Sequence, residues 1–281
     1  MEPISVADAE LSEAEALFDF EAAAPERACD ALGIDAIRVG GGVALSVRRD
    51  PSRFWSKVLG LGVESPITLE LVETVRDFYR ACGTPVTTFQ IAPSLLPDDW
   101  EEICARVGLS AAGAWIKLAC PVEAAVRAAA DPDRPPPRVT VGPVQATDAS
   151  AWASAVLRGF GMPDDGIGEM AAASVGRPGW HAFAAWDDAE LVATGTLYVR
   201  GAVGQLLAAA TLPHARRRGA QSAILAARAR AAQSAGCRWL VAETGVEPPD
   251  GHNSSLHNML RLGFEVLYAR PNWTWQAQPS R

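Results

Sequence analysis

The 281-residue sequence lacks any apolar run long enough to cross a bilayer, which needs roughly 20 consecutive apolar residues. Its five cysteines are scattered and form no C-x-x-C pair, so we expect reduced thiols rather than a disulfide framework. The four histidines do not follow a zinc-binding spacing, although His252 and His257 stand five residues apart near an expected loop. The sequence therefore predicts a cytoplasmic protein with no metal site and no membrane partner.

Positive charge is also scarce, because the formal net charge is -8. A global positive field that would bind nucleic acid nonspecifically is thereby excluded, and any basic site must be local. Residues 1–30 carry nine acidic side chains and one arginine, Arg27, whereas signal and transit peptides need basic flanks. We expect this segment to be a solvated face or a partly ordered lead-in rather than a targeting signal.

Two common nucleotide-binding motifs are missing, since neither G-x-x-x-x-G-K-[ST] nor G-x-G-x-x-G occurs. Residues 211–225 instead read TLPHARRRGAQSAIL, with three arginines directly before an expected helix. One interpretation is a solvated basic turn. The other is an anion site, because Gly219 permits a close backbone turn and the first N–H groups of a helix have no internal partners. Such a loop can hold a pyrophosphate through main-chain donors, with arginines adding charge-assisted bonds.

Proline marks the division of the chain. The segment DPDRPPPR at 131–138 holds four prolines and cannot continue a helix or join a central strand. We expect a domain at residues 1–130, a linker at 131–137 and a second domain at 138–281. The 49% hydrophobic content and the length suit two modest globular domains.

Downstream of the linker, strands first run together and then alternate with helices, which is typical of an α/β protein with a mixed sheet. Asp148 is expected to cap the first helix and Gly236 to end the third. The expected strands cover 139–144, 180–186, 191–199, 203–212, 238–243 and 264–275. The expected helices cover 148–160, 165–175, 220–234 and 254–261.

The region before the linker repeats part of this plan. RACGTPVTTFQIAP followed by WEEICARVGLSAAGAWIKL parallels QSAGCRWLVAETG followed by LHNMLRLGFEVLYARPNWTW. The glycines that would end the helices are 25 residues apart in the first half and 27 in the second. This pattern indicates an internal duplication. The pairs are Gly83 with Gly108, and Gly236 with Gly263.

The two copies differ at the anion loop. Residues 54–82 read as strand, turn and amphipathic helix, with an apolar stripe at helical spacing. The turn offers Glu64, Ser65 and Pro66 where the second copy has three arginines and Gly219. A carboxylate repels phosphate, and proline removes a donor. We therefore expect one phosphate site per chain, in the second copy.

Residues 203–275 resemble the GNAT superfamily of acetyl-CoA-dependent N-acetyltransferases. The resemblance rests on Pro213, Arg216 and Gly219, which fit the Arg/Gln-x-x-Gly-x-Gly/Ala signature after a strand, and on NSSLHNMLRLGF at 253–264. Gln221 departs from the signature, because a small residue stands there in the family. The resemblance implies a tandem GNAT protein whose two lobes share the acyl-CoA N-acyltransferase fold, the N-terminal copy being degenerate.

The resemblance also implies where acetyl-CoA, the co-substrate, would bind. Strands 203–212 and 238–243 would splay apart, pantetheine would pair with the edge of the first, and the pyrophosphate would lie on the arginine loop. For Asn253 and Asn258, contact with acetyl-CoA and a helix cap or surface amide are the alternatives. The implied binding residues are Ala209, Ala210, Thr211, Leu212, Arg216, Arg217, Arg218, Gly219, Ala220, Gln221, Ser222, Asn253 and Asn258.

Acetyl transfer to an amine requires a neutral nucleophile, a polarised thioester carbonyl and a way to protonate the departing thiolate. Many family members place a tyrosine where this chain has Met259. We therefore assign the acid role to solvent or His257, and the general base role to Glu243 at the end of strand 238–243. A salt bridge or capping role is the alternative for Glu243.

The acceptor is not specified by the sequence beyond a small-molecule or peptide amine. The resemblance places it near 160–164, where Asp164 and Asp165 would favour a cationic amine if they face the cleft, and near Trp273 and Trp275, for which core packing is the alternative. Acetyl-CoA binding without turnover, as in a sensor protein, is the rival function. A nucleic-acid module using the arginines is disfavoured by the acidic balance. The chain is expected to be a monomer or a homodimer.

Overall fold

The computed structural model describes residues 2–133 and 136–277. It divides into two compact units, one comprising Met1–Ile116 with Tyr268–Arg281 and the other Lys117–Leu267. Within the described parts of the chain, no helix combines the length and apolarity that a bilayer crossing requires. Two of the seven predicted linker residues, Arg134 and Pro135, lie outside the described residues.

The elements predicted downstream of the linker are all present, with ends shifted by at most three residues, and all but the last strand lie in the second unit. Gly236, at φ +78°, ends the long helix α8 as expected. Asp148 precedes its helix but makes no capping hydrogen bond with its side chain. The helices are α5 (Val122–Ala129), α6 (Ala149–Phe160), α7 (Ile167–Ala172), α8 (Ala220–Ser234) and α9 (Ser254–Arg261). The strands are β6 (Thr140–Pro143), β7 (Trp180–Asp187), β8 (Glu190–Arg200), β9 (Val203–Thr211) and β10 (Trp239–Gly245).

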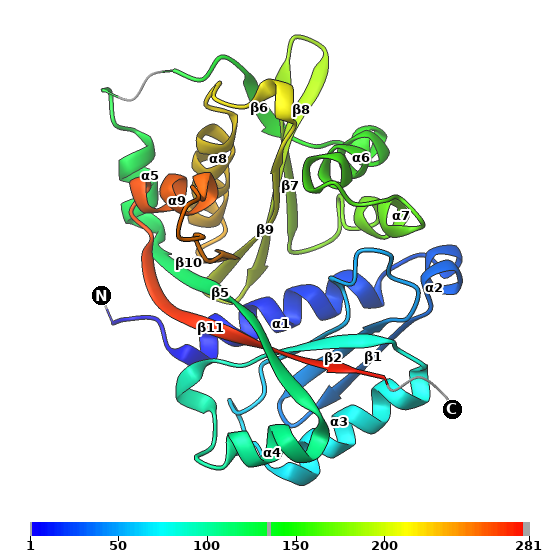
Figure 1. The fold of residues 1–281 in the computed structure, drawn as a ribbon. Helices are drawn as coiled ribbons and strands as arrows, with labels where there is room; N and C mark the ends of the chain where they lie inside the picture. The colour runs from blue at the N-terminus through cyan, green and yellow to red at the C-terminus, as the bar shows by residue number, and fades with distance from the viewer. Residues whose placement is uncertain (1, 134–135, 278–281) are drawn as a thin grey trace. The chain divides into compact units, whose positions relative to one another are not determined.

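The strand order in this unit is β5-β10-β9-β8-β7-β6, where β5 spans Leu109–Pro121, and the sheet is mixed. Strands β6 to β9 are antiparallel neighbours, whereas β10 runs parallel to β9. Helix α8 covers one face of β7–β9, and α6 and α7 cover the other (Figure 1). Gly195 of β8 allows α8 this close, because a Cβ there would lie 2.6 Å from Ile224. Strand and helix periodicity thus yield the predicted sheet with helices on both faces.

The first unit repeats the plan with the strand order β1-β2-β3-β4-β11-β5. Its core cluster includes Val72, Val75 and Tyr79 from the predicted apolar stripe, with Leu69 and Phe78 packed against it. The helices are α1 (Val6–Ala22), α2 (Glu26–Leu32), α3 (Leu69–Cys82) and α4 (Trp100–Val107). The strands are β1 (Ile34–Val39), β2 (Gly42–Val47), β3 (Lys57–Leu59), β4 (Val86–Gln90), β5 (Leu109–Pro121) and β11 (Glu265–Gln276).

The duplicated glycines occupy equivalent backbone positions in both units. Gly83, Gly108, Gly236 and Gly263 all have left-handed φ values, between +69° and +95°. Each stands at a helix end, where a residue without Cβ can turn the chain at no steric cost. The predicted two-lobe architecture with repeated helix–strand–helix–strand order is confirmed.

The compact units do not coincide with the segments on either side of the linker. Strands β5 and β11 contribute residues to both units, and the C-terminal residues 272–276 pair with β4 of the first unit. Helix α5 precedes the linker but packs against α8 of the second unit. The predicted domains at 1–130 and 138–281 therefore give the order of the two copies along the chain. The compact units of the structure have different boundaries.

A buried acid distinguishes the first unit. Glu21 is fully buried, and neither side-chain oxygen has a hydrogen-bond partner among the described residues. Burial raises the pKa of Glu21 well above its usual 4.5, although the charge of Lys57 opposes the shift. The folded state therefore favours the neutral acid, and Glu21 destabilises the fold progressively as the pH rises above about 4.5.

We expect Glu21→Gln to raise the free energy of unfolding at pH 7, because the amide needs no ionisation, and to have little effect at pH 4. Urea unfolding at both pH values measures this difference, with the exposed Glu26→Gln as the control. A gain of the same size at both pH values, or a loss at pH 7, would contradict the assignment.

Candidate functional site

The predicted anion loop lies between β9 and α8. A 3-10 turn at Pro213–Ala215 follows the strand, and Gly219 precedes the helix at φ +80°. No side chain of the described residues caps the N-terminus of α8. The first backbone N–H groups of the helix therefore have no internal acceptor and carry the positive end of the helix dipole.

The three arginines of the loop have different environments. Arg218 pairs with Asp187, and its carbonyl accepts a hydrogen bond of 3.1 Å from the N–H of Arg138. Arg218 therefore ties the loop to β7 and to the chain after the linker. Arg216 and Arg217 are exposed, and Arg217 takes a left-handed φ of +63°. These two can reach an anion without breaking an internal ion pair.

The departure at Gln221 has a structural explanation. The side-chain amide of Gln221 donates to Ser255 Oγ at 3.1 Å, and its carbonyl oxygen accepts from Asn258. The side chain is thus committed to α9 and does not fill the loop. Asn258 thus bridges α8 and α9.

The predicted splay begins midway along β9. Strand β9 pairs in parallel with β10 over Val203–Gln205. Among the described residues, no further residue pair joins these two strands beyond Gln205. On the other side of β9 the register with β8 jumps from Thr194↔Ala210 to Thr196↔Leu207. Two residues of β9 thus oppose one of β8, which is a β-bulge, and Ala208 within it has φ +50°. The bulge redirects the half-buried backbone around Ala209, Ala210 and Thr211.

Buried polar groups hold the bulge in place. Arg228 of α8 donates to the carbonyl oxygens of Thr196 and Leu207, at 3.2 and 3.3 Å. Burial lowers the pKa of Arg228 to about 9, and the hydroxyl of Thr194 donates to Ala208 O at 2.9 Å. On the opposite face Gly159 lets α6 approach, since a Cβ there would lie 2.5 Å from Ala210 Cβ.

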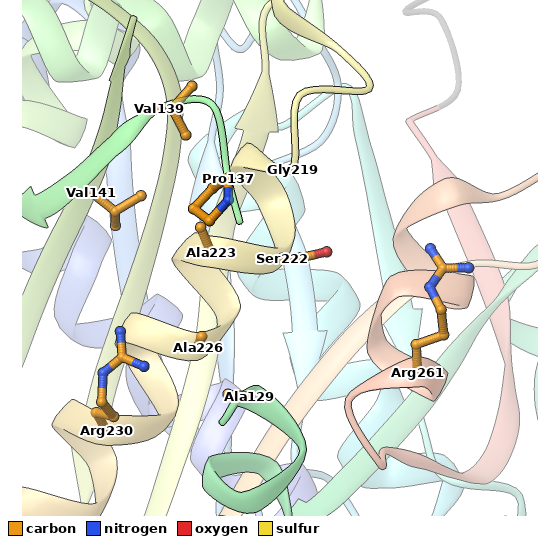
Figure 2. A pocket seen from close by; sticks show the side chains of 10 residues that line it. All are labelled: Ala129, Pro137, Val139, Val141, Gly219, Ser222, Ala223, Ala226, Arg230 and Arg261. Atoms are coloured by element: carbon orange, nitrogen blue, oxygen red, sulfur yellow. The ribbon is translucent and has the colours of Figure 1, made fainter. Parts of the chain in front are cut away.

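A cavity of about 410 Å³ adjoins the N-terminal half of α8. Figure 2 shows Gly219 directly before α8, Ser222 and Arg230 on this helix and Arg261 on α9. Sequence reasoning identified Gly219 and Ser222 but missed the two arginines, because their positions depend on how α8 and α9 pack. The remaining lining is mostly apolar and comprises Ala129, Pro137, Val139, Val141, Ala223 and Ala226.

The predicted general base lies in an ion pair. Glu243 is near the end of β10 and is 12% exposed, and its Oε2 lies 4.0 Å from Nζ of fully buried Lys117 on β5. The salt bridge that the sequence left as an alternative is therefore present. Lys117 was not predicted, because no local pattern links the two strands.

The predicted acid and the asparagines lie around the start of α9. Asn253 is the N-cap, accepting from Ser255 N and Leu256 N at 3.1 Å. Its amide donates to Thr244 Oγ1 and Gly245 O, so every polar atom of this side chain is engaged. His257, on the first turn of α9, pairs with Glu247 at 2.8 Å. Met259 is buried in the position where the family carries tyrosine.

The predicted acceptor residues are divided between different environments. Trp275 is buried in the core cluster of the first unit, and Trp273 packs against that cluster with its ring 5.7 Å from that of Trp100. Core packing therefore explains both tryptophans. In the second unit Phe160 is 51% exposed, and Asp164 accepts a hydrogen bond of 2.9 Å from the N–H of Gly168 in the first turn of α7.

The first unit offers no equivalent anion loop in its described residues. Helix α3 begins after Thr68, whose hydroxyl already accepts from Leu71 N at 3.2 Å. Glu64 packs against Gly41, where an added Cβ would lie 2.5 Å from the Cβ of the glutamate. A capped helix and a nearby carboxylate both disfavour phosphate.

Comparisons with known proteins support the fold and the family resemblance. Residues 157–264 match the model of the acetyltransferase (GNAT) family. This segment is a GNAT domain. A GCN5-related N-acetyltransferase from Kribbella flavida shares 17% identity over 98% of both chains, with a TM-score of 0.64. A tandem GNAT protein from the clavulanic acid biosynthesis pathway, solved without AcCoA, shares 18% over 88% of this chain and 84% of that chain, with a TM-score of 0.56.

A functionally unknown conserved protein from Staphylococcus epidermidis ATCC 12228 shares 12% identity over 88% of this chain and 96% of that chain, with a TM-score of 0.58. No curated protein matches the chain. At these identities the structural likeness establishes the fold alone. The GNAT domain carries the splayed strands and the arginine loop, whereas the first lobe carries the same fold without a comparable loop.

Proposed function

We propose that the GNAT domain binds acetyl-CoA and transfers its acetyl group directly to a primary amine in a ternary complex. The observation that carries this proposal is that β9 separates from β10 and then leads, through the arginine loop, into the uncapped N-terminus of α8. The first offers backbone donors and two exposed arginines to a pyrophosphate. The second offers an unpaired strand edge to an extended amide-containing arm.

In the proposed reaction acetyl-CoA supplies an activated thioester. The amine nitrogen attacks the carbonyl carbon, the carbon–sulfur bond breaks, and the amine loses one proton as the thiolate gains one. Glu243 takes the proton from the amine, directly or through water, and His257 or solvent protonates the thiolate. The bulge at Ala208 supplies backbone N–H groups near the carbonyl oxygen, where negative charge develops.

We expect Glu243→Gln to lower kcat for acetyl transfer about 100-fold or more, with the affinity for acetyl-CoA unchanged, because the amide cannot accept the amine proton. A thiol-release assay with a panel of amines measures kcat, and calorimetry measures affinity. The exposed Glu265→Gln, also on a strand of the described chain, is the matched control. A wild-type rate in Glu243→Gln would limit Glu243 to its ion pair with Lys117.

Acetyl-CoA binding without turnover is the second candidate function. It is favoured by buried Met259, which cannot donate a proton, and by the engagement of His257 with Glu247. In that case the same assay shows no thiol release with any small-molecule or peptide amine, although calorimetry detects binding. Thiol release that depends on an added amine would instead exclude the sensor function.

A further inference from the structure

The geometry points to a zinc-class metal site formed by Glu247, His252 and His257; an ion held there leaves solvent, the alternative to His257, to protonate the thiolate in the proposed reaction. The ligand atoms of these three residues all lie within 4.8 Å of one another. Sequence spacing did not predict the site, because Glu247 lies outside any histidine motif. The loop between β10 and α9 folds back and brings it beside the two rings.

The three ligand atoms already converge on one point. Glu247 Oε2 lies 2.8 Å from Nε2 of His257 and 3.8 Å from Nδ1 of His252. The two imidazole rings stack with centroids 4.5 Å apart and planes 23° from parallel. Donor atoms around a tetrahedral zinc ion stand roughly 3.3–3.5 Å apart, given zinc–ligand bonds of about 2.0–2.2 Å. Small side-chain rotations therefore suffice to enclose an ion.

The loop that carries the ligands is anchored at its base. Glu247 accepts a hydrogen bond of 2.7 Å from the N–H of Asn253, which also caps α9 and bonds to Gly245 O. Part of the ordering cost of a metal site is thereby already met in the metal-free protein.

The ligand set selects the class of metal. Two imidazole nitrogens and one carboxylate suit Zn²⁺, Ni²⁺ or Cu²⁺, whereas Ca²⁺ and Mg²⁺ prefer all-oxygen sites. The metal would bind Nε2 of His257, Nδ1 of His252 and Oε2 of Glu247, the atoms that already face one another. Three protein ligands leave a fourth position for water. The side chains are 34% to 64% exposed, so an ion can enter from solvent.

The role of His252 distinguishes a metal site from a structural hydrogen bond between Glu247 and His257. If the contact is only structural, Glu247 and His257 form it and His252 merely stacks on the ring of His257. In a metal site, His252 is a required ligand. The exposed pair of His214 and Glu190, with an Nε2–oxygen distance of 3.3 Å, is the matched control, because among the described residues no third metal-binding side chain joins this pair.

Zn²⁺ titration of the full-length, chelator-treated protein by calorimetry tests the proposal. We expect one Zn²⁺ per chain, at least tenfold weaker binding in His252→Ala and His257→Ala, and unchanged binding in His214→Ala. Co²⁺ as a spectroscopic probe should give visible bands of a four-coordinate nitrogen–oxygen site. Absent binding, equal binding in His252→Ala, or a near-ultraviolet thiolate–cobalt band would each overturn the proposal, the last by placing the ion at a cysteine.

Discussion

Gly219→Val is expected to lower the affinity for acetyl-CoA at least about 100-fold, through loss of two or more charge-assisted hydrogen bonds. Gly219 has φ +80°, which a β-branched residue adopts only with strain, and an added Cβ would lie 3.3 Å from Pro137 Cα. The loop must therefore change its path, and the backbone donors at the start of α8 no longer converge on the pyrophosphate. Calorimetric titration with acetyl-CoA measures the loss.

Gly236→Val is the matched control for backbone strain. Gly236 lies at the other end of the same helix with φ +78°, and an added Cβ there meets nothing within 4 Å. Its substitution should destabilise the fold by a similar amount and leave the affinity for acetyl-CoA unchanged. Circular dichroism verifies that both variants are folded, and Gly219→Ala provides a milder version of the same test. Full affinity in a folded Gly219→Val protein would place the phosphate site elsewhere.

Arg270→Met is expected to lower the free energy of unfolding by about 3–5 kcal/mol, because it leaves buried carboxylates without their cation. Arg270 contacts Glu10 at 3.0 Å and Glu13 at 2.9 Å, and all three side chains are almost fully buried. Tyr268 donates a further hydrogen bond of 2.8 Å to Glu10. Urea unfolding followed by circular dichroism measures the effect.

Arg38, which is exposed and pairs with the partly buried Glu15, provides the comparison for this prediction. Arg38→Met should cost no more than about 1 kcal/mol, since a surface ion pair gains little over solvent. If Arg270→Met does not fold, adding Glu10→Gln and Glu13→Gln should restore folding by removing the uncompensated charges. Equal losses for Arg270→Met and Arg38→Met would contradict the importance assigned to the buried cluster.

Local pattern was sufficient to predict most of the second unit. The strands 180–186 and 191–199 and the helix 220–234 have hydrophobic periods and end signals that tertiary packing does not override. The apolar stripe of α3 through Val72 and Val75 was likewise predictable from its helical spacing. The predicted division at the linker did not anticipate the compact units, because pairing of the C-terminal strand with β4 is a long-range contact that no local signal encodes.

The candidate site was predictable where backbone chemistry defines it and less so where side chains meet. Gly219 follows from the conformation that the loop needs. That Arg218 is held by Asp187 while Arg216 and Arg217 stay exposed depends on strand β7, about thirty residues earlier in the chain. Glu247 joins His257 through a loop whose course the sequence pattern does not specify.

Titration of acetyl-CoA into the full-length protein is the most direct test of the central claim, which is that the second lobe alone holds the co-substrate. We predict one acetyl-CoA per chain, binding that is lost when Arg216→Ala and Arg217→Ala are combined, and binding that is nearly unaffected by Glu64→Gln. Two independent sites of similar affinity, or no binding to the folded wild-type chain, would contradict it.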